Sequence, residues 1–305
     1  MDNRLTKRRL SDFLAYDWIA ILILIAAAIL FWELVFTVSA TRLSVGQQFK
    51  FYFDEDVSTN GEIYDLLDDT FSYEVLSVEA ENLQSTYNVL SVRLSVNEGD
   101  AIFTSSIQKE DGTVRAKTVI DNFPVYDLNE LLKNAEDYLS QFKTGEELDD
   151  EKISAYFDKR MQGDKRFKTD EEKAQGRKDE IARIKKLASD VKDFETLLNS
   201  ENQDLFYKYV RYEQASGGDE NEENYGAAYK NAKEKGELIY GINLGALTGG
   251  KSNVSDYVKA YDAETESYSN VVLMIFDMTK HQPDLQYETI SFTVTLVKEF
   301  SNILG

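Results

Sequence analysis

A loop rich in oxygen-bearing side chains, DEDVSTNGEI, follows the first aromatic stretch of the sequence. It places Asp56, Ser58 and Asn60 at alternate positions. This spacing is that of the first half of an EF-hand Ca²⁺ loop, in which Gly61 would make the sharp turn. The position of the final bidentate glutamate is Leu67, however. A Ca²⁺ site at these three residues and an ordinary turn that begins a helix both stay open.

Residues for other kinds of chemistry are scarce. The chain has no cysteine, which excludes disulfides, thiolate zinc sites, iron–sulfur clusters and thiol catalysis. The single histidine, His281, argues against a Ser-His-Asp triad and reads as a loop residue. There is no G-x-S-x-G, G-x-G-x-x-G or H-E-x-x-H motif. The carboxylates are too numerous to single out an acid/base pair, so we expect no enzyme and no cofactor other than Ca²⁺.

Residues 18–38 form an apolar stretch long enough to predict one transmembrane helix, because about 20 residues cross the hydrocarbon core. Four basic residues precede it, namely Arg4, Lys7, Arg8 and Arg9. Only two follow it closely, Arg42 and Lys50. The positive-inside rule then predicts a cytoplasmic tail at residues 1–17 and an extracellular C-terminal domain. We expect a single-pass protein of the cell membrane.

Two features of this stretch leave alternatives open. Small residues before position 41 would allow cleavage after Ala40, although the apolar run is longer than in a usual signal peptide. We therefore favour an uncleaved anchor. Glu33 is the one ionisable residue in the stretch. Two interpretations of Glu33 stay open. Its side chain would extend to the outer lipid headgroups, or it would contact a membrane partner such as a permease or another integral subunit.

The charge of the chain excludes one class of partner. There are 34 Lys plus Arg against 55 Asp plus Glu, a net charge of −21. Such a surface repels phosphate backbones, so we expect no nucleic-acid binding. The hydrophobic content of 42% is sufficient for a folded core. Without cysteines for lipid anchoring, the acidic domain fits a Gram-positive cell envelope.

Hydrophobic periodicity predicts an α/β fold in which strands and helices alternate. Strands are expected at 47–53, 72–80, 100–105, 238–244 and 270–276, helices at 62–71, 128–142, 180–198 and 285–304, and either at 87–96. We predict a transmembrane helix at 18–38 followed by a two-lobed, mixed-sheet ectodomain with a helical middle section. Residues 39–126 and 236–305 would form the sheet-containing lobe, and 127–235 the helix-rich lobe.

Three segments together resemble extracellular solute-binding proteins of ABC importers, which have a type 2 periplasmic-binding-like fold. They are the strand at 49–53 with the turn and helix start after it, the run 90–103 that enters the third strand, and the last helix after Pro283. The resemblance implies ligand contacts from the loops after the first and third strands. Those residues are Asp54, Glu55, Thr104, Ser105 and Ser106. The chain departs from the family in lacking a lipidated cysteine.

The resemblance favours a non-enzymatic, membrane-anchored domain that captures a small solute or peptide at the outer membrane face. The alternative is an accessory or structural subunit of a membrane complex without a small ligand. A hydrolase of the cell envelope is a third hypothesis, and the missing catalytic motifs argue against it.

Overall fold

The computed structural model describes residues 18–39, 47–67, 70–83, 86–211, 237–260, 270–277 and 287–304. Contacts divide the chain into two compact units, Met1–Leu43 and Ser44–Gly305. Several sequence predictions lie outside the described residues: the basic tail, the cleavage site after Ala40 and His281.

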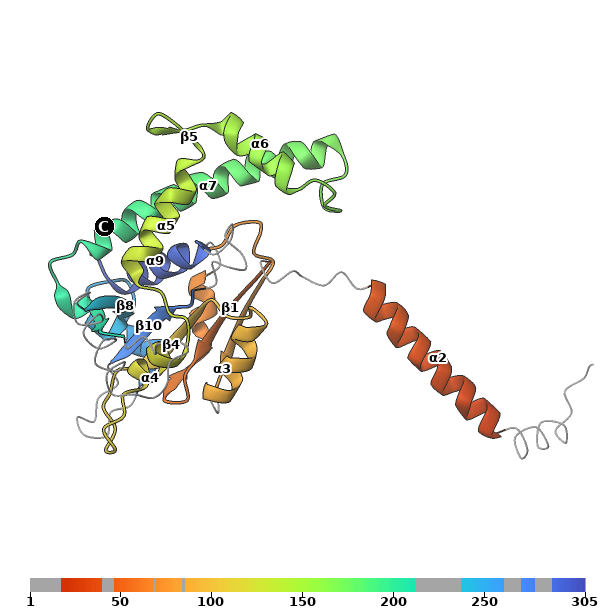
Figure 1. The fold of residues 1–305 in the computed structure, drawn as a ribbon, viewed down its shortest axis with the longest axis horizontal. Coiled ribbons are helices and arrows are strands. Elements are labelled where there is room, and N and C mark those ends of the chain that lie inside the picture. Colours follow the sequence, from red (N-terminus) through yellow and green to blue (C-terminus); the bar gives the residue numbers. More distant parts are fainter. Residues whose placement is uncertain are drawn as a thin grey trace, which may run out of the picture. The chain divides into compact units, whose positions relative to one another are not determined.

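The described part of the first unit is the helix α2 (Trp18–Ser39), drawn in red in Figure 1. Its large apolar side chains are exposed, among them Leu24 at 72% and Trp32 at 71%. Within the described part of the chain, no helix combines the length and the apolarity needed to cross a membrane. The predicted transmembrane helix at 18–38 is therefore wrong as part of the fold class.

The second unit is built on a six-stranded mixed sheet with the order β3-β1-β4-β10-β8-β7. β3 and β4 pair parallel with β1, whereas β10 is antiparallel to both β4 and β8, and β7 is antiparallel to β8. The strand bounds are β1 Gln48–Phe53, β3 Ser77–Asn82, β4 Ala101–Ser105, β7 Phe206–Tyr209, β8 Leu238–Asn243 and β10 Val271–Ile275. The predicted α/β class with a mixed sheet is confirmed.

Helices cover both faces of this sheet (Figure 1). On one face lie α5 (Leu128–Ser140), α7 (Asp170–Leu198) and α9 (Glu288–Phe300), and on the other lie α3 (Thr86–Ser95) and α4 (Arg115–Asn122). The central strands β4 and β10 are buried at every position, because successive side chains point to opposite sides and helices cover both. In β1, Phe51 and Phe53 join the core under α9, while Tyr52 joins the core under α3 and α4.

The segment at 87–96, open between strand and helix in the sequence, is helical as α3. β3 and β4 are both parallel to β1, and parallel strands need a crossover connection, which is usually a helix. Leu90 and Leu94, four residues apart, are buried against the sheet, whereas Val92 is 64% exposed. The strand hypothesis would have buried Val92 together with Leu90.

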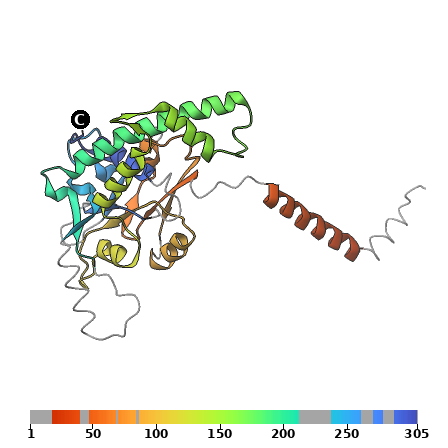
Figure 2. The ribbon, with the colours of Figure 1, turned by 45° about the horizontal axis from the view of Figure 1, so that its top comes forward.

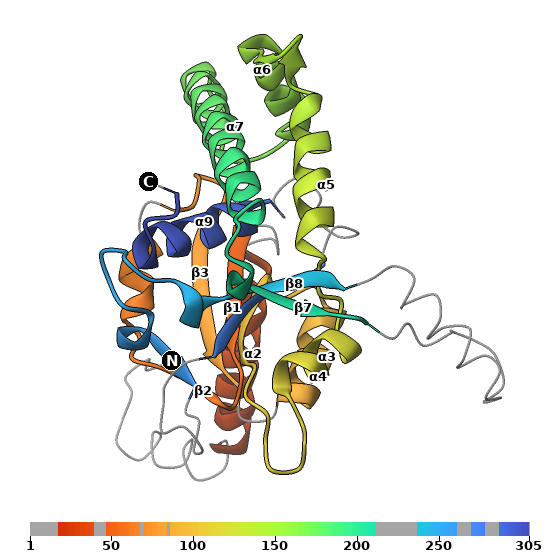
Figure 3. The ribbon, with the colours of Figure 1, turned by 90° about the vertical axis from the view of Figure 1, so that its left-hand side faces the viewer.

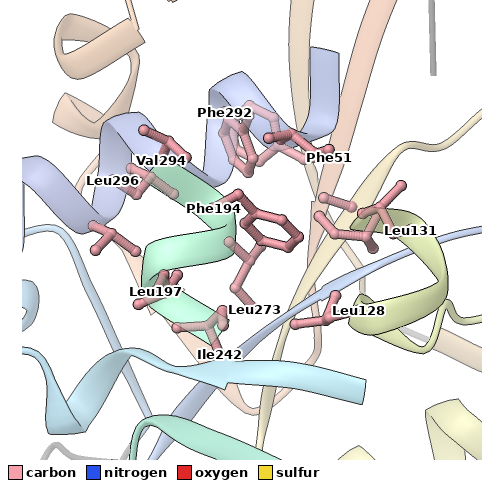
Figure 4. Close-up of a cluster of buried hydrophobic side chains, with 14 of the residues drawn as sticks. Phe51, Leu128, Leu131, Phe194, Leu197, Ile242, Leu273, Phe292, Val294 and Leu296 are labelled. Atoms are coloured by element: carbon pink, nitrogen blue, oxygen red, sulfur yellow. The ribbon is translucent and has the colours of Figure 1, made fainter. Parts of the chain in front are cut away.

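The helical middle section belongs to the same compact unit as the sheet. Figure 4 shows Phe194 of α7 and Leu131 of α5 in one cluster with Phe51 of β1 and Phe292 of α9. This shared core is the physical reason for the single unit.

The α6–α7 hairpin extends beyond the sheet (Figures 2 and 3). α6 (Asp150–Arg160) packs on α7, which begins ten residues earlier than predicted. A capping box explains this start: the Thr169 hydroxyl accepts from the Glu172 amide, and the Glu172 carboxylate accepts from the Thr169 amide.

Short elements complete the fold. The pairs are β2 (Val57–Thr59) with β9 (Val258–Ala260) and β5 (Lys143–Thr144) with β6 (Glu147–Leu148). The 3₁₀ turns in the described part of the chain are η2 (Glu62–Leu67), η3 (Gln203–Leu205), η4 (Leu244–Ala246) and η5 (Val254–Asp256). The helix predicted at 62–71 is thus only the 3₁₀ turn η2, in which Ile63 and Leu67 are buried.

Candidate functional site

One edge of the sheet collects the loops in which the sequence places its candidate site. The carboxyl ends of β1 and β4 lie there, and their pairing with β10 and β8 brings the start of β10 and the end of β8 to the same edge. Ligands of open α/β sheets bind in crevices outside the carboxyl ends of the strands. The polar side chains along this edge are therefore the candidates for a ligand site.

Asp54, directly after β1, is the centre of a buried polar cluster. Its side chain is fully buried and accepts a hydrogen bond from Thr104 Oγ1 at 2.7 Å. It also pairs with the Arg115 guanidinium of α4, at 2.8 Å. The structure therefore brings the predicted residues Asp54 and Thr104 together. Their polar groups contact each other and Arg115 within the protein.

Arg115 links three consecutive carboxylates. It lies 3.1 Å from Glu55 and 3.9 Å from Asp56, and Asp56 also pairs with Lys109 at 2.7 Å. Burial by itself lowers the pKa of the Arg115 guanidinium, but the hydrogen bond and charge of Asp54 outweigh it and raise that pKa above its ordinary value. The guanidinium is therefore charged, and it holds the 54–56 turn in place.

The serines after β4 are also engaged within the protein. Ser105 is buried, and its hydroxyl accepts from the Ile107 amide at 3.1 Å. The Ser106 amide donates to the Asn270 carbonyl at 3.0 Å. Of the five predicted ligand residues, Glu55 is the one with an exposed side chain. Their role in ligand binding stays a prediction.

The proposed Ca²⁺ residues each have a protein partner. Asp56 pairs with Lys109, the Ser58 hydroxyl donates to the Lys259 carbonyl, and Asn60 Oδ1 accepts from the Glu62 amide. Residues 57–59 are extended in β2, whereas an EF-hand loop wraps around its ion. No group of three His, Cys, Asp or Glu side chains suited to a metal occurs among the described residues.

Glu33, the predicted contact with a membrane partner, lies on α2, and its side chain is exposed. Its role stays a prediction.

A pocket of about 260 Å³ opens at the same sheet edge, between η4, η5 and the start of β10. Leu244, Val271 and Phe300 form its apolar part. Hydroxyl and amide side chains form its polar part: Thr248, Ser252, Asn253, Ser255 and Asn270. No charged side chain lines it among the residues that the structure describes.

Asn270 connects this pocket to the loop after β4. Its carbonyl accepts from the amide and the hydroxyl of Ser106, and its φ is +72°. A left-handed conformation is uncommon outside glycine, though Asn tolerates it better than most residues, and such conformations are frequent at binding sites. Within the described chain, the side chains of Asn270, Thr248 and Ser255 make no hydrogen bond, so their polar groups are available to a ligand.

The pocket loop contains a motif that was not among the sequence predictions. Gly245–Ser252 reads GALTGGKS, the G-x-x-x-x-G-K-[ST] spacing of a nucleotide phosphate-binding loop. It follows strand β8 as that motif requires, but a 3₁₀ turn follows it instead of a helix. Lys251 is 82% exposed and lies 3.9 Å from Glu299.

The backbone of this loop caps a helix instead of cradling a phosphate. The amides of Gly250, Lys251 and Ser252 donate to the carbonyls of Phe300 and Glu299, at the end of α9. These carbonyls would otherwise lack partners. The amides that would surround a phosphate are therefore occupied, and the motif has a structural role here.

A second buried polar cluster ties the helices together. Arg183 of α7 pairs with Glu180 at 2.9 Å and with Glu288 of α9 at 3.4 Å. Arg160 of α6 joins Glu180 at 3.1 Å and Glu74 at 3.2 Å. Because these buried charges are paired, the cluster holds α6, α7 and α9 in register.

The sequence reasoning missed Arg115 and Asn270. Arg115 lies 61 residues from Asp54, and no local spacing connects the two. Asn270 was assigned to the start of a strand, and only its backbone conformation sets it apart. A scan against protein-family models, a search of curated proteins and a search of solved structures each found no match to this chain.

Proposed function

We propose that the second unit, Ser44–Gly305, is a non-enzymatic binding domain that captures a small, uncharged polar solute at the carboxyl edge of its sheet. The observation that carries this proposal is the pocket of about 260 Å³ beside Asn270. It lies where α/β sheets bind ligands, and it combines a few polar groups with an apolar wall.

The chemistry of the pocket selects the ligand class. Its lining offers hydroxyl and amide groups from Thr248, Ser255 and Asn270, and no charged group among the described residues. An ionic ligand would lose its hydration there without gaining a counter-charge. A sugar, a polyol or a short amide can exchange its hydrogen bonds with water for hydrogen bonds with these groups. The volume is slightly below the usual range for drug-sized ligands, which favours a solute the size of a monosaccharide.

The buried Asp54–Arg115 cluster supports this function without contacting the ligand. It fixes the turn after β1, while the Ser106–Asn270 hydrogen bonds fix the loop after β4 against the pocket. A binding site held by such rigid contacts loses little conformational entropy when its ligand binds.

Thermal unfolding of the full chain with a panel of neutral sugars, polyols, amino acids and short peptides tests the proposal. A ligand at a hundredfold excess over its Kd should stabilise the protein by about 2.7 kcal/mol. Thr248→Trp would fill the pocket from its exposed wall and should abolish this stabilisation. Thr196→Trp, on an exposed part of α7, is the matched control and should retain it.

The absence of any shift with neutral solutes would refute the proposal. So would a shift that Thr248→Trp and Thr196→Trp leave equally unchanged, because the ligand would then bind elsewhere.

The exposed apolar side chains of α2 favour a second function, that of an accessory subunit without a small ligand. Exposed apolar surface of this kind marks contacts with other molecules. Leu30 is 70% exposed and Trp32 71% exposed. This function predicts no stabilisation by any member of the panel, together with loss of a partner in pull-down when Leu30 and Trp32 are replaced by Ser.

A further inference from the structure

A second cavity lies at the tip of the α6–α7 hairpin, on different elements from the pocket at the sheet edge. Its volume is about 490 Å³, within the usual range of small-molecule sites. Phe157, Met161 and Phe167 form its apolar part, with the Phe157 and Phe167 rings in edge-to-face contact at 4.9 Å. Phe157 is buried, and Phe167 is half-buried.

The rim of this cavity is basic although the whole chain is strongly acidic. Lys165, Lys168 and Lys173 line it, and within the described residues none of their ammonium groups forms an ion pair. The acidic side chains at the rim are already neutralised. Asp158 pairs with Arg177 at 2.8 Å, and Asp164 pairs with Arg166 at 2.9 Å.

From this arrangement we propose that the hairpin cavity binds an organic anion with an apolar body. The apolar body would contact the Phe157 and Phe167 rings, and the anionic group would lie among the three lysine ammonium groups. An inorganic anion would leave the aromatic wall without a partner, and a neutral apolar molecule would leave the ammonium groups unused. The ligand class therefore differs from that of the sheet-edge pocket, where no charged side chain is available.

The position of the cavity gives this binding a structural consequence. Phe167 lies between α6 and α7, and the Arg166 guanidinium lies 5.3 Å from its ring. Arg166 also reaches Glu74, in the segment before β3, at 3.6 Å. A ligand on Phe167 would therefore lie near Arg166, whose ion pair with Glu74 connects the hairpin to the segment before β3.

Fluorescence titrations of the full chain with two probes test the proposal. The probes are 8-anilino-1-naphthalenesulfonate, an organic anion, and N-phenyl-1-naphthylamine, its neutral relative. The variant Lys165→Ala/Lys168→Ala/Lys173→Ala removes the basic rim. The variant Lys133→Ala/Lys192→Ala/Lys208→Ala removes the same charge from exposed lysines outside the cavity and is the matched control.

We expect the rim variant to bind the sulfonate about tenfold more weakly than the wild type, because three weak charge contacts are lost together. The control variant should match the wild type, and the neutral probe should bind all three proteins equally. Equal weakening in both variants would show an effect of net charge alone and would overturn the proposal. Unchanged sulfonate binding in the rim variant, or equal loss of both probes, would overturn it as well.

Discussion

Asp100, at the amino end of β4, has a carboxyl group whose pKa burial raises to about 7. The hydrogen bond from the Lys50 amide, at 2.7 Å, and the charge of Lys50 both lower this pKa, but burial outweighs them. The folded protein therefore holds the proton more tightly than the unfolded chain, in which the pKa is near 3.8. It follows that the free energy of unfolding decreases as the pH rises from about 4 to about 7.

We expect Asp100→Asn to remove this part of the pH dependence. The amide oxygen still accepts from Lys50 and does not ionise. The free energy of unfolding of the wild type should fall relative to that of the variant as the pH rises, by at most about 1.4 kcal/mol per pH unit. Urea denaturation of both proteins between about pH 5 and pH 7 measures the difference. Parallel pH profiles would contradict this assignment.

At the scale of elements, the packing of α6 on α7 depends on Gly176. A methyl group at this position would collide with the Phe157 ring and would lie 2.7 Å from the Phe167 ring. Alanine is favoured over glycine in a helix by about 1 kcal/mol, but overpacking a core costs about 1–3 kcal/mol. The clash involves a buried ring, so it should outweigh the gain in helix propensity.

Gly176→Ala should therefore lower the free energy of unfolding, measured by urea denaturation. Thr196→Ala, on the exposed side of α7, is the control for helix propensity and should leave stability equal or slightly higher. A Gly176→Ala protein more stable than the wild type would show that the two rings move aside without cost.

At the scale of the whole molecule, the net charge of −21 makes the folded state repel itself. Surface ion pairs offset little of this repulsion, because exposed pairs are individually weak. Raising the ionic strength from about 0.01 M to about 0.1 M shortens the Debye length from about 30 Å to about 10 Å. Screening should therefore stabilise the fold.

We expect the Tm to rise by a few degrees over this range of NaCl concentration, since about 1 kcal/mol corresponds to about 2–4 °C for a domain of this size. Scanning calorimetry measures the change, and sucrose at equal osmolality is the uncharged control. A falling Tm would show that the ion pairs of the folded state outweigh the repulsion.

The elements that were predicted well are those whose pattern is local. The strand expected at 47–53 is β1, and the helix expected at 128–142 begins at the expected residue as α5. The Asp127 carboxylate caps that start by accepting from the Asn129 amide. Local patterns did not predict the full length of every helix. The polar residues 170–179 gave no apolar stripe, and the capping box at Thr169 shows why they are nonetheless helical. The correction with the largest effect on the fold class concerns residues 18–38, which were predicted to form a transmembrane helix.

The sequence by itself determined the α/β class, most of the strands, and the polar loops after β1 and β4. Hydrophobic periodicity and turn residues are read within a few positions, so they are visible without a fold. Only the tertiary structure decided that Arg115 neutralises Asp54, that the loop at 245–252 caps α9, and that a pocket forms beside Asn270. The first two contacts join residues about 50 or more positions apart. The pocket gathers the separate segments 244–255, 270–271 and Phe300. Spacing in the chain therefore carries no sign of these contacts.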